Sequence, residues 1–235
     1  MSAGQKTLFD PNNPHKPIVI KPSNSRVSVP GFSDNTETPP LKVTDEFGNV
    51  RPAWYNEHSD KGKMCRYPDL LRDIIKADNE LQYITSSGWL LINWENVSTI
   101  RKFLMQSLEY LLCKDMKFCQ SENVEHHFWK ILFHNIIEMM RKVIISDVKN
   151  KECYKGFVLF LIDEGVKYYE ILLDMLERAY NFKINDFLGN NATPEKEGFV
   201  SLALISAQKL FLYLGDLLRY KEQVNETSNY GKCRQ

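Results

Sequence analysis

The sequence contains little cysteine, and its cysteines are not arranged as a framework. Its 235 residues include five cysteines, an odd number, widely spaced and without a CxxC pair or a His/Cys cluster. This spacing excludes a disulfide scaffold and a zinc site of the usual type, so ordinary free thiols are expected. We predict no metal site and no cofactor.

An excess of charge and a long apolar run are also missing. Thirty basic residues match 30 acidic ones, so the formal net charge is zero. That balance argues against attraction to nucleic acid or to an anionic membrane as the main activity. No stretch reaches the roughly 18 apolar residues of a membrane span, and the first residues lack the apolar segment of a signal peptide. We therefore expect an intracellular protein without membrane contact.

Catalytic motifs are absent as well. The sequence has no GxSxG, HExxH, GxGxxG or phosphate-binding GxxxxGK[ST] motif. Asp163 and Glu164 are neighbours on a predicted helix and point in different directions, which favours a solvated or salt-bridged pair over an acid–base couple. His126 and His127 cannot converge on one ion and are predicted to be surface histidines. We predict that the chain is not an enzyme.

What is present divides near residue 60. Eight of the ten prolines precede residue 53, in a stretch that is polar and rich in turn-forming residues. Residues 1–60 are therefore predicted to be a disordered or extended N-terminal arm. The segment PIVIKP within it could pair as a short strand, although a linker is favoured.

Residues 61–235 are predicted to form an all-α domain, an antiparallel array of long helices joined by short connections. Apolar residues recur at helical spacing in five segments. These begin at Pro68, near Trp94, after Ser121, near Glu152 and near Glu195; the second is expected to reach Phe118, the fourth Asn181 and the fifth Gln223. The residues from Tyr230 onward look like the first turn of a sixth helix.

Two of these helices carry cations beside their apolar stripes. Lys130, His134 and Arg141 share one face of the third helix. Lys209, Asp216 and Arg219 share a side of the fifth. If the two helices pack together, the cations would line the wall of an anion-binding groove. The spacing alone leaves open the alternative of solvated faces with scattered ion pairs.

Around these residues the sequence resembles a known family. GDLLRYKEQ, with the preceding ALISAQKLFLYL and the stretches KDMKFCQSENVEHHFWK and LIDEGVKYYEILLDMLERAYNFKINDF, is similar to the 14-3-3-like domain of the SMG family of nonsense-mediated mRNA decay factors. This family is also named after the yeast "ever shorter telomeres" protein. The similar blocks keep their order over most of residues 95–235 and are closest to the family's endonuclease, telomerase-binding member. The resemblance implies a 14-3-3-like, TPR-like helical array that binds phosphoserine or phosphothreonine peptides.

The resemblance also implies which residues hold the phosphate. Arg141 matches an arginine of the third helix, and Arg219 with Tyr220 matches an Arg-Tyr pair of the fifth. The position of a lysine seven residues before the first arginine falls on His134, which removes one permanent charge. Two guanidinium groups and a tyrosine hydroxyl suit a phosphate dianion, because they donate charge-assisted and neutral hydrogen bonds in a fixed geometry.

Partners and location follow from the same resemblance. It implies a phosphorylated RNA helicase of the decay pathway as the main partner, with other decay factors, telomerase or telomeric DNA reached through the full-length protein, in cytoplasm and nucleus. The alternatives are a telomerase-associated nucleic-acid-binding role and a purely structural scaffold. The chain lacks the PIN nuclease domain of the endonuclease member and is expected to be an incomplete fragment of a longer protein.

Overall fold

The computed structural model describes residues 7–8, 18–19, 43–44, 50–55, 60–187 and 198–225. The chain divides into two units, residues 1–38 and 39–235. In the first unit, β1 (Thr7–Leu8) and β2 (Ile18–Val19) pair antiparallel. The two residues of β2 lie within PIVIKP and pair as a short strand, the alternative to the favoured linker; the other residues of PIVIKP fall outside the described ones. The disorder predicted for the rest of this unit falls outside the described residues.

The second unit starts with a short strand pair that leads into the helical core. Here β3 (Val43–Thr44) pairs with β4 (Val50–Arg51), and the 3₁₀ turn η1 (Ala53–Tyr55) follows. The Trp54 side chain is only 1% exposed, and its ring lies 6.2 Å from that of Phe118 and 5.3 Å from that of His127. A segment assigned to the N-terminal arm therefore contributes to the core of the helical unit.

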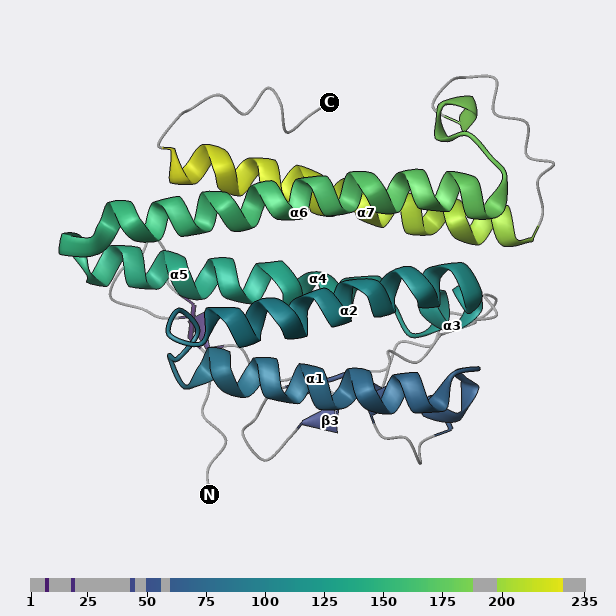
Figure 1. Cartoon of the computed structure of the whole chain (residues 1–235), viewed down its shortest axis with the longest axis horizontal. Helices are drawn as coiled ribbons and strands as arrows, with labels where there is room; N and C mark the ends of the chain where they lie inside the picture. The colour runs from purple at the N-terminus through teal and green to yellow at the C-terminus, as the bar shows by residue number, and fades with distance from the viewer. Residues whose placement is uncertain are drawn as a thin grey trace. The chain divides into compact units, whose positions relative to one another are not determined.

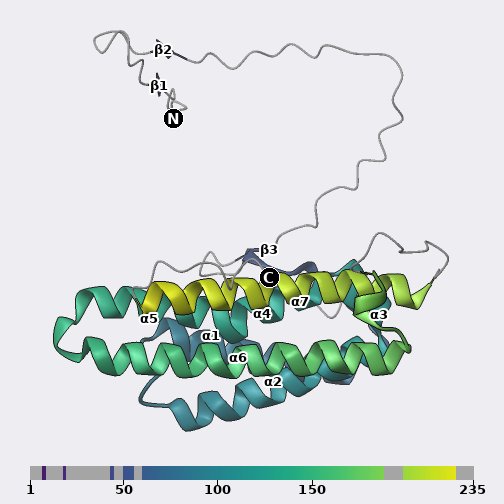
Figure 2. The same cartoon turned by 90° about the horizontal axis from the view of Figure 1, so that it is seen from above.

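The rest of the second unit is an array of helices, which confirms the predicted all-α class. Figures 1 and 2 show the long helices side by side, with α6 along α7 and α1 along α2. The elements after η1 are η2 (Gly62–Met64), α1 (Pro68–Ser86), α2 (Trp94–Lys114), α3 (Met116–Ser121), α4 (Val124–Trp129), the π-helical turn η3 (Lys130–His134), α5 (Asn135–Ser146), η4 (Val148–Asn150), α6 (Lys151–Tyr180), η5 (Ile184–Phe187) and α7 (Phe199–Val224).

Two of the predicted helices are interrupted. The second ends at Lys114, and α3 starts a residue later, because the Asp115 side chain leaves the helix and accepts the backbone N–H of Arg66 at 2.8 Å. The third begins only at Val124, after Asn123 with its φ of 51°, and is interrupted by the π-helical turn η3. The predicted apolar stripes are largely buried. The fourth segment also has Phe160 at an apolar-stripe position, but 54% of this residue is exposed.

Gly165 sets how closely α6 approaches its neighbours. A Cβ atom at this position would lie 2.8 Å from Leu217 Cδ1 on α7 and 2.8 Å from Phe133 Cε1 in η3. No other residue type fits without displacing one of these side chains. The glycine thereby lets α6, α7 and the π-helical turn meet at close range, one turn from Tyr220.

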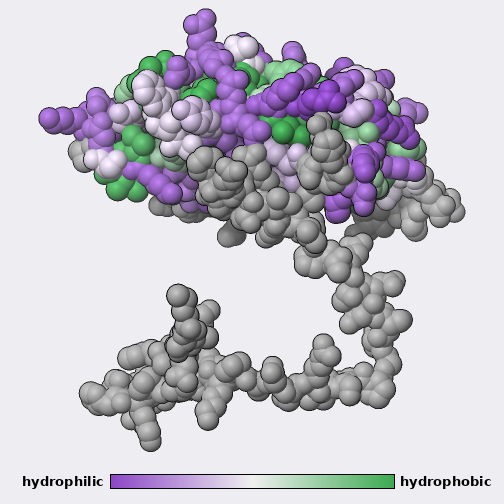
Figure 3. Space-filling model, turned by 90° about the horizontal axis from the view of Figure 1, so that it is seen from below, coloured by the Kyte–Doolittle hydropathy of each residue, from purple (hydrophilic) through white to green (hydrophobic). Residues whose placement is uncertain are grey.

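The helix α7 is the most apolar of the long helices. Within the described part of the chain it alone is long and apolar enough, by length and composition, to cross a membrane, a test that core helices also pass. It buries Leu210, Leu217 and Tyr220, while Phe211 and Leu212 remain exposed. Hydrophilic residues dominate the surface of the helical unit on the α1 side, and the hydrophobic residues there form separate spots (Figure 3).

Candidate functional site

Tyr220 on α7 lies at the centre of the residues that the resemblance singled out. The guanidinium carbon of Arg219 is 4.6 Å from the centre of the Tyr220 ring, and that of Arg141 is 5.4 Å from the same point. The two guanidinium groups are therefore at most about 10 Å apart. The His134 ring lies 6.4 Å away, edge-on to Tyr220. The structure thus brings together Arg141, Arg219, Tyr220 and His134, called here the tyrosine cluster.

Each arginine of the tyrosine cluster is paired with an acidic residue three positions earlier on its own helix. Asp216 Oδ1 accepts from Arg219 Nε at 3.1 Å and from Nη2 at 2.9 Å. Glu138 Oε1 accepts from Arg141 Nη1 at 2.7 Å. All four side chains are 36–43% exposed. Ion pairs at this exposure contribute little, about 0–1 kcal/mol, so an incoming anion can replace the carboxylates.

The charges of the cluster support one another. Burial raises the pKa of Tyr220, and its hydrogen bond to Glu138 raises it further, while Arg219 opposes both. Burial also raises the pKa of Glu138, but hydrogen bonds from Tyr220 and Arg141 outweigh it, so the net shift is downward. Burial lowers the pKa of Arg219, and Asp216 reverses that shift. Two guanidinium groups, each paired with a carboxylate, therefore flank the Tyr220 phenol, and this arrangement can bind an oxyanion by exchange of partners.

A buried arginine that the sequence reasoning missed holds the third helix in place. Arg101 on α2 is 1% exposed. It donates from Nε to the carbonyl of Leu132 in η3 at 3.1 Å and from Nη1 to Glu164 on α6 at 2.6 Å. Its guanidinium also lies 5.1 Å from the centre of the Phe133 ring. A π-helical turn departs from the regular hydrogen bonding of an α-helix, and Arg101 supplies a donor to one of its carbonyls.

Arg101 could have been noticed as a cation next to Ile100 in an apolar stripe. Its carboxylate partner belongs to the Asp163–Glu164 pair, which was predicted to be solvated or salt-bridged. The structure agrees, since Asp163 contacts Lys221 at 2.7 Å while Glu164 contacts Arg101. The two carboxylates point to different helices and do not form an acid–base couple.

The prediction of two surface histidines was wrong. His127 Nε2 lies 2.7 Å from Oδ2 of the fully buried Asp78 and 3.2 Å from the Tyr55 hydroxyl. His127 on α4 therefore contacts both η1 and α1. These segments are far apart in the sequence, so the sequence alone could not predict the contacts. His126 is half-buried and lines a groove. Within the described ranges, no three His, Cys, Asp or Glu residues are placed to hold a metal ion.

The groove beside His126 runs between α4 and α7 and has a volume of about 670 Å³. Three residues predicted to share a side of the fifth helix, Lys209, Asp216 and Arg219, all line it. Lys130 affects this groove indirectly, because its positive charge helps to lower the pKa of His126. Arg141 instead lines a second hollow of about 350 Å³, beside Ile145 and Lys155.

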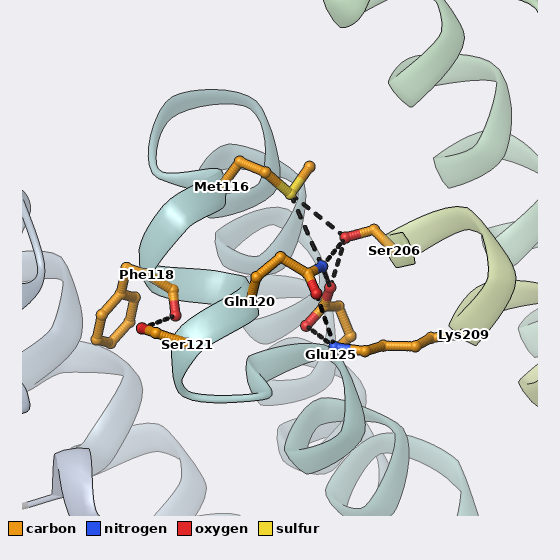
Figure 4. A network of polar contacts seen from close by, with 7 residues as sticks. All are labelled: Met116, Phe118, Gln120, Ser121, Glu125, Ser206 and Lys209. Atoms are coloured by element: carbon orange, nitrogen blue, oxygen red, sulfur yellow. Dashed lines mark hydrogen bonds and ion pairs between the residues drawn. The ribbon is translucent and has the colours of Figure 1, made fainter. Parts of the chain in front are cut away.

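A buried polar network fixes Lys209 at the edge of the groove (Figure 4). Its Nζ lies 3.4 Å from Oε2 of the fully buried Glu125 and donates to Oε1 of Gln120 at 3.1 Å. Ser206 on α7 donates to the same Glu125 carboxylate. The network ties α7 to α3 and α4, so the positive charge of Lys209 is largely matched from within.

The fold and the site together define a helical binding module. The family of telomerase activating protein Est1 matches residues 123–225. That range contains all four residues of the tyrosine cluster, and the match supports the family predicted from the sequence. The chain is also 32% identical over 145 residues to "Telomerase-binding protein EST1A" of Danio rerio. This alignment covers 60% of the chain and 9% of the length of that relative.

Proposed function

We propose that the chain binds phosphoserine or phosphothreonine peptides and thereby connects an mRNA decay factor of the EST1 family to a phosphorylated RNA helicase. The phosphate would lie over Tyr220 and take the guanidinium groups of Arg141 and Arg219 from Glu138 and Asp216. His134 would contribute a third donor. Such contacts occur where the full-length protein acts, in cytoplasm and nucleus.

The position of two half-exposed arginines on one tyrosine ring carries this proposal. A guanidinium pair within about 10 Å can be bridged by one phosphate, because charge-assisted hydrogen bonds are about 2.8 Å long on each side. Weak local pairing keeps both groups oriented without holding them tightly. As cation–π contacts within a scaffold, two exposed arginines on one ring would contribute only about 0.5–1 kcal/mol each.

Matched peptides test the proposal. One peptide series carries phosphoserine and the other serine at the same position, and dissociation constants are measured with the full chain at fixed ionic strength. We expect binding of the phosphorylated peptides to be at least about thirtyfold tighter, since charged hydrogen-bonded pairs contribute roughly 2 kcal/mol or more. Equal affinity within each pair would overturn the proposal.

A second candidate is a direct contact with telomerase or with telomeric DNA. The printed names of the matching family and of the relative point to telomerase. The zero net charge of the chain makes a nucleic-acid surface the weaker of the two. A salt titration separates them, because nucleic-acid binding falls steeply with salt and does not depend on phosphorylation of a peptide.

A further inference from the structure

The groove between α4 and α7 combines exposed apolar side chains with one arginine of the tyrosine cluster. Leu212 is 69% exposed and Phe211 is 44% exposed, and both line the groove together with Arg219. Large apolar side chains that are exposed together and bordered by polar residues are typical of a contact site for a partner. Their position beside Arg219 places any partner of the tyrosine cluster next to them.

The geometry of α7 fixes the distance between the apolar part of the groove, at Leu212, and the charged part, at Arg219. Leu212, Asp216 and Arg219 follow one another at intervals of four and three residues, so they lie on one face of α7. Seven residues of helix correspond to about 10 Å along the axis. An extended peptide covers that distance with about three residues.

The charges that line the groove are already matched at the end away from Arg219. Lys209 is paired with the buried Glu125. Burial lowers the pKa of His126, and the neighbouring cations Lys130 and Lys209 lower it further, so the imidazole is neutral at pH 7. An acidic side chain would find no unmatched cation there, whereas an apolar one would cover Leu212 and Phe211.

We propose that this groove binds an apolar side chain of the phosphorylated peptide, about three residues from the phosphorylated one. The inference rests on the proposed function, because the tyrosine cluster anchors the peptide and Arg219 belongs to both parts. The apolar contact would select among phosphorylated sequences that the phosphate contact alone does not distinguish.

The test uses a phosphoserine host peptide of alanine, serine and glycine, in which one leucine is moved through the five positions on each side. Dissociation constants are measured with the full chain. Leucine about three residues away on one side should tighten binding about tenfold, as expected for burial of most of a leucine side chain. Leucine at positions well away from this one should change little.

Two variants separate the groove from other surfaces. Leu212→Asp should remove the preference for leucine and leave the affinity for the leucine-free peptide within about twofold of wild type. Ile92→Asp is the matched control, since Ile92 is 78% exposed and does not line this groove, and it should keep the full preference.

The outcomes are distinct. Phosphate-dependent binding with no positional preference for leucine, or a preference that survives in Leu212→Asp, overturns this inference and leaves the proposed function standing. Binding that ignores phosphorylation overturns the proposed function, and this inference with it.

Discussion

Two arginines in this molecule have different surroundings: one is buried and supports the fold, and the other is half-exposed and belongs to the candidate binding site. Arg101 is 1% exposed and joins α2 to the π-helical turn and to α6. Arg219 is 40% exposed, and its carboxylate partner comes from its own helix three residues earlier. The first arginine connects segments that are distant in sequence, whereas the second contacts a carboxylate that can be displaced without moving a helix.

The difference separates a residue that holds the fold from one that is available to a ligand. A buried guanidinium needs its partners, because an unpaired buried charge is very costly. A half-exposed one exchanges partners at little cost. Arg141, paired with Glu138 at three residues' spacing, belongs with Arg219. This contrast predicts opposite consequences for the two kinds of arginine.

The largest expected effect is on stability at Arg101. Arg101→Met should lower the free energy of unfolding by about 3 kcal/mol, because it leaves the Leu132 carbonyl without its donor and Glu164 without its cation. Urea denaturation measures the change. Arg178→Met is the control, since Arg178 pairs on the surface of α6, and it should change stability by less than about 0.5 kcal/mol. Equal effects at the two positions would remove the contrast.

A smaller effect is expected where a carboxylate competes with the phosphate. Asp216→Asn should tighten phosphopeptide binding about threefold, since the ligand no longer displaces a charged partner from Arg219. Asp174→Asn, which removes the equivalent carboxylate beside Arg178, should leave binding unchanged. Weaker binding in Asp216→Asn would contradict this competition and would mean that the Asp216 carboxylate orients Arg219 for the ligand.

His134 allows a test of similar size at the edge of the cluster. The lysine expected there from the resemblance would add a permanent positive charge near the phosphate. His134→Lys should therefore tighten phosphopeptide binding two- to threefold at about 0.1 M salt and less at higher salt, because ions screen the added charge. No change at either salt concentration would place His134 outside the site, with Arg141, Arg219 and Tyr220 holding the phosphate.

The smallest expected effect concerns pH and His126. Its pKa is lowered in the folded chain, so the unfolded chain binds more protons below the ordinary histidine pKa of about 6.5. Stability should consequently fall as pH drops from 7.5 to 5.5, and His126→Gln should flatten that slope. If the variant keeps the same dependence of stability on pH, the folded chain does not favour the neutral form of His126.

The sequence predicted the helices better than their interruptions. Apolar spacing was sufficient for Val97, Leu104 and Leu108, which are all buried, because that spacing reports directly which face turns inward. It could not predict the end of α2 at Asp115, whose carboxylate binds the backbone of Arg66, 49 residues away. The π-helical turn depends in the same way on Arg101, a donor from another helix.

The candidate site was predicted in part for a similar reason. Spacing suggested that Arg141 and Arg219 lie beside apolar stripes, and the resemblance named Tyr220 as their neighbour. Glu138 and Asp216 each stand three positions before an arginine, a spacing that allows an ion pair, and the structure pairs them with Arg141 and Arg219. The sequence could not place His127 against Asp78 and Trp54, because that contact joins three separate segments.

The most direct test of the central claim compares Arg219→Gln with Arg178→Gln, two arginines of α7 and α6 whose carboxylate partners lie on their own helices. Affinity for one phosphoserine peptide and the free energy of unfolding are measured for both. The account predicts at least thirtyfold weaker binding for Arg219→Gln, or about 2 kcal/mol, with stability within about 0.5 kcal/mol of wild type and no effect of Arg178→Gln on either quantity. Wild-type affinity in Arg219→Gln, or a loss of stability comparable to that of Arg101→Met, would contradict it.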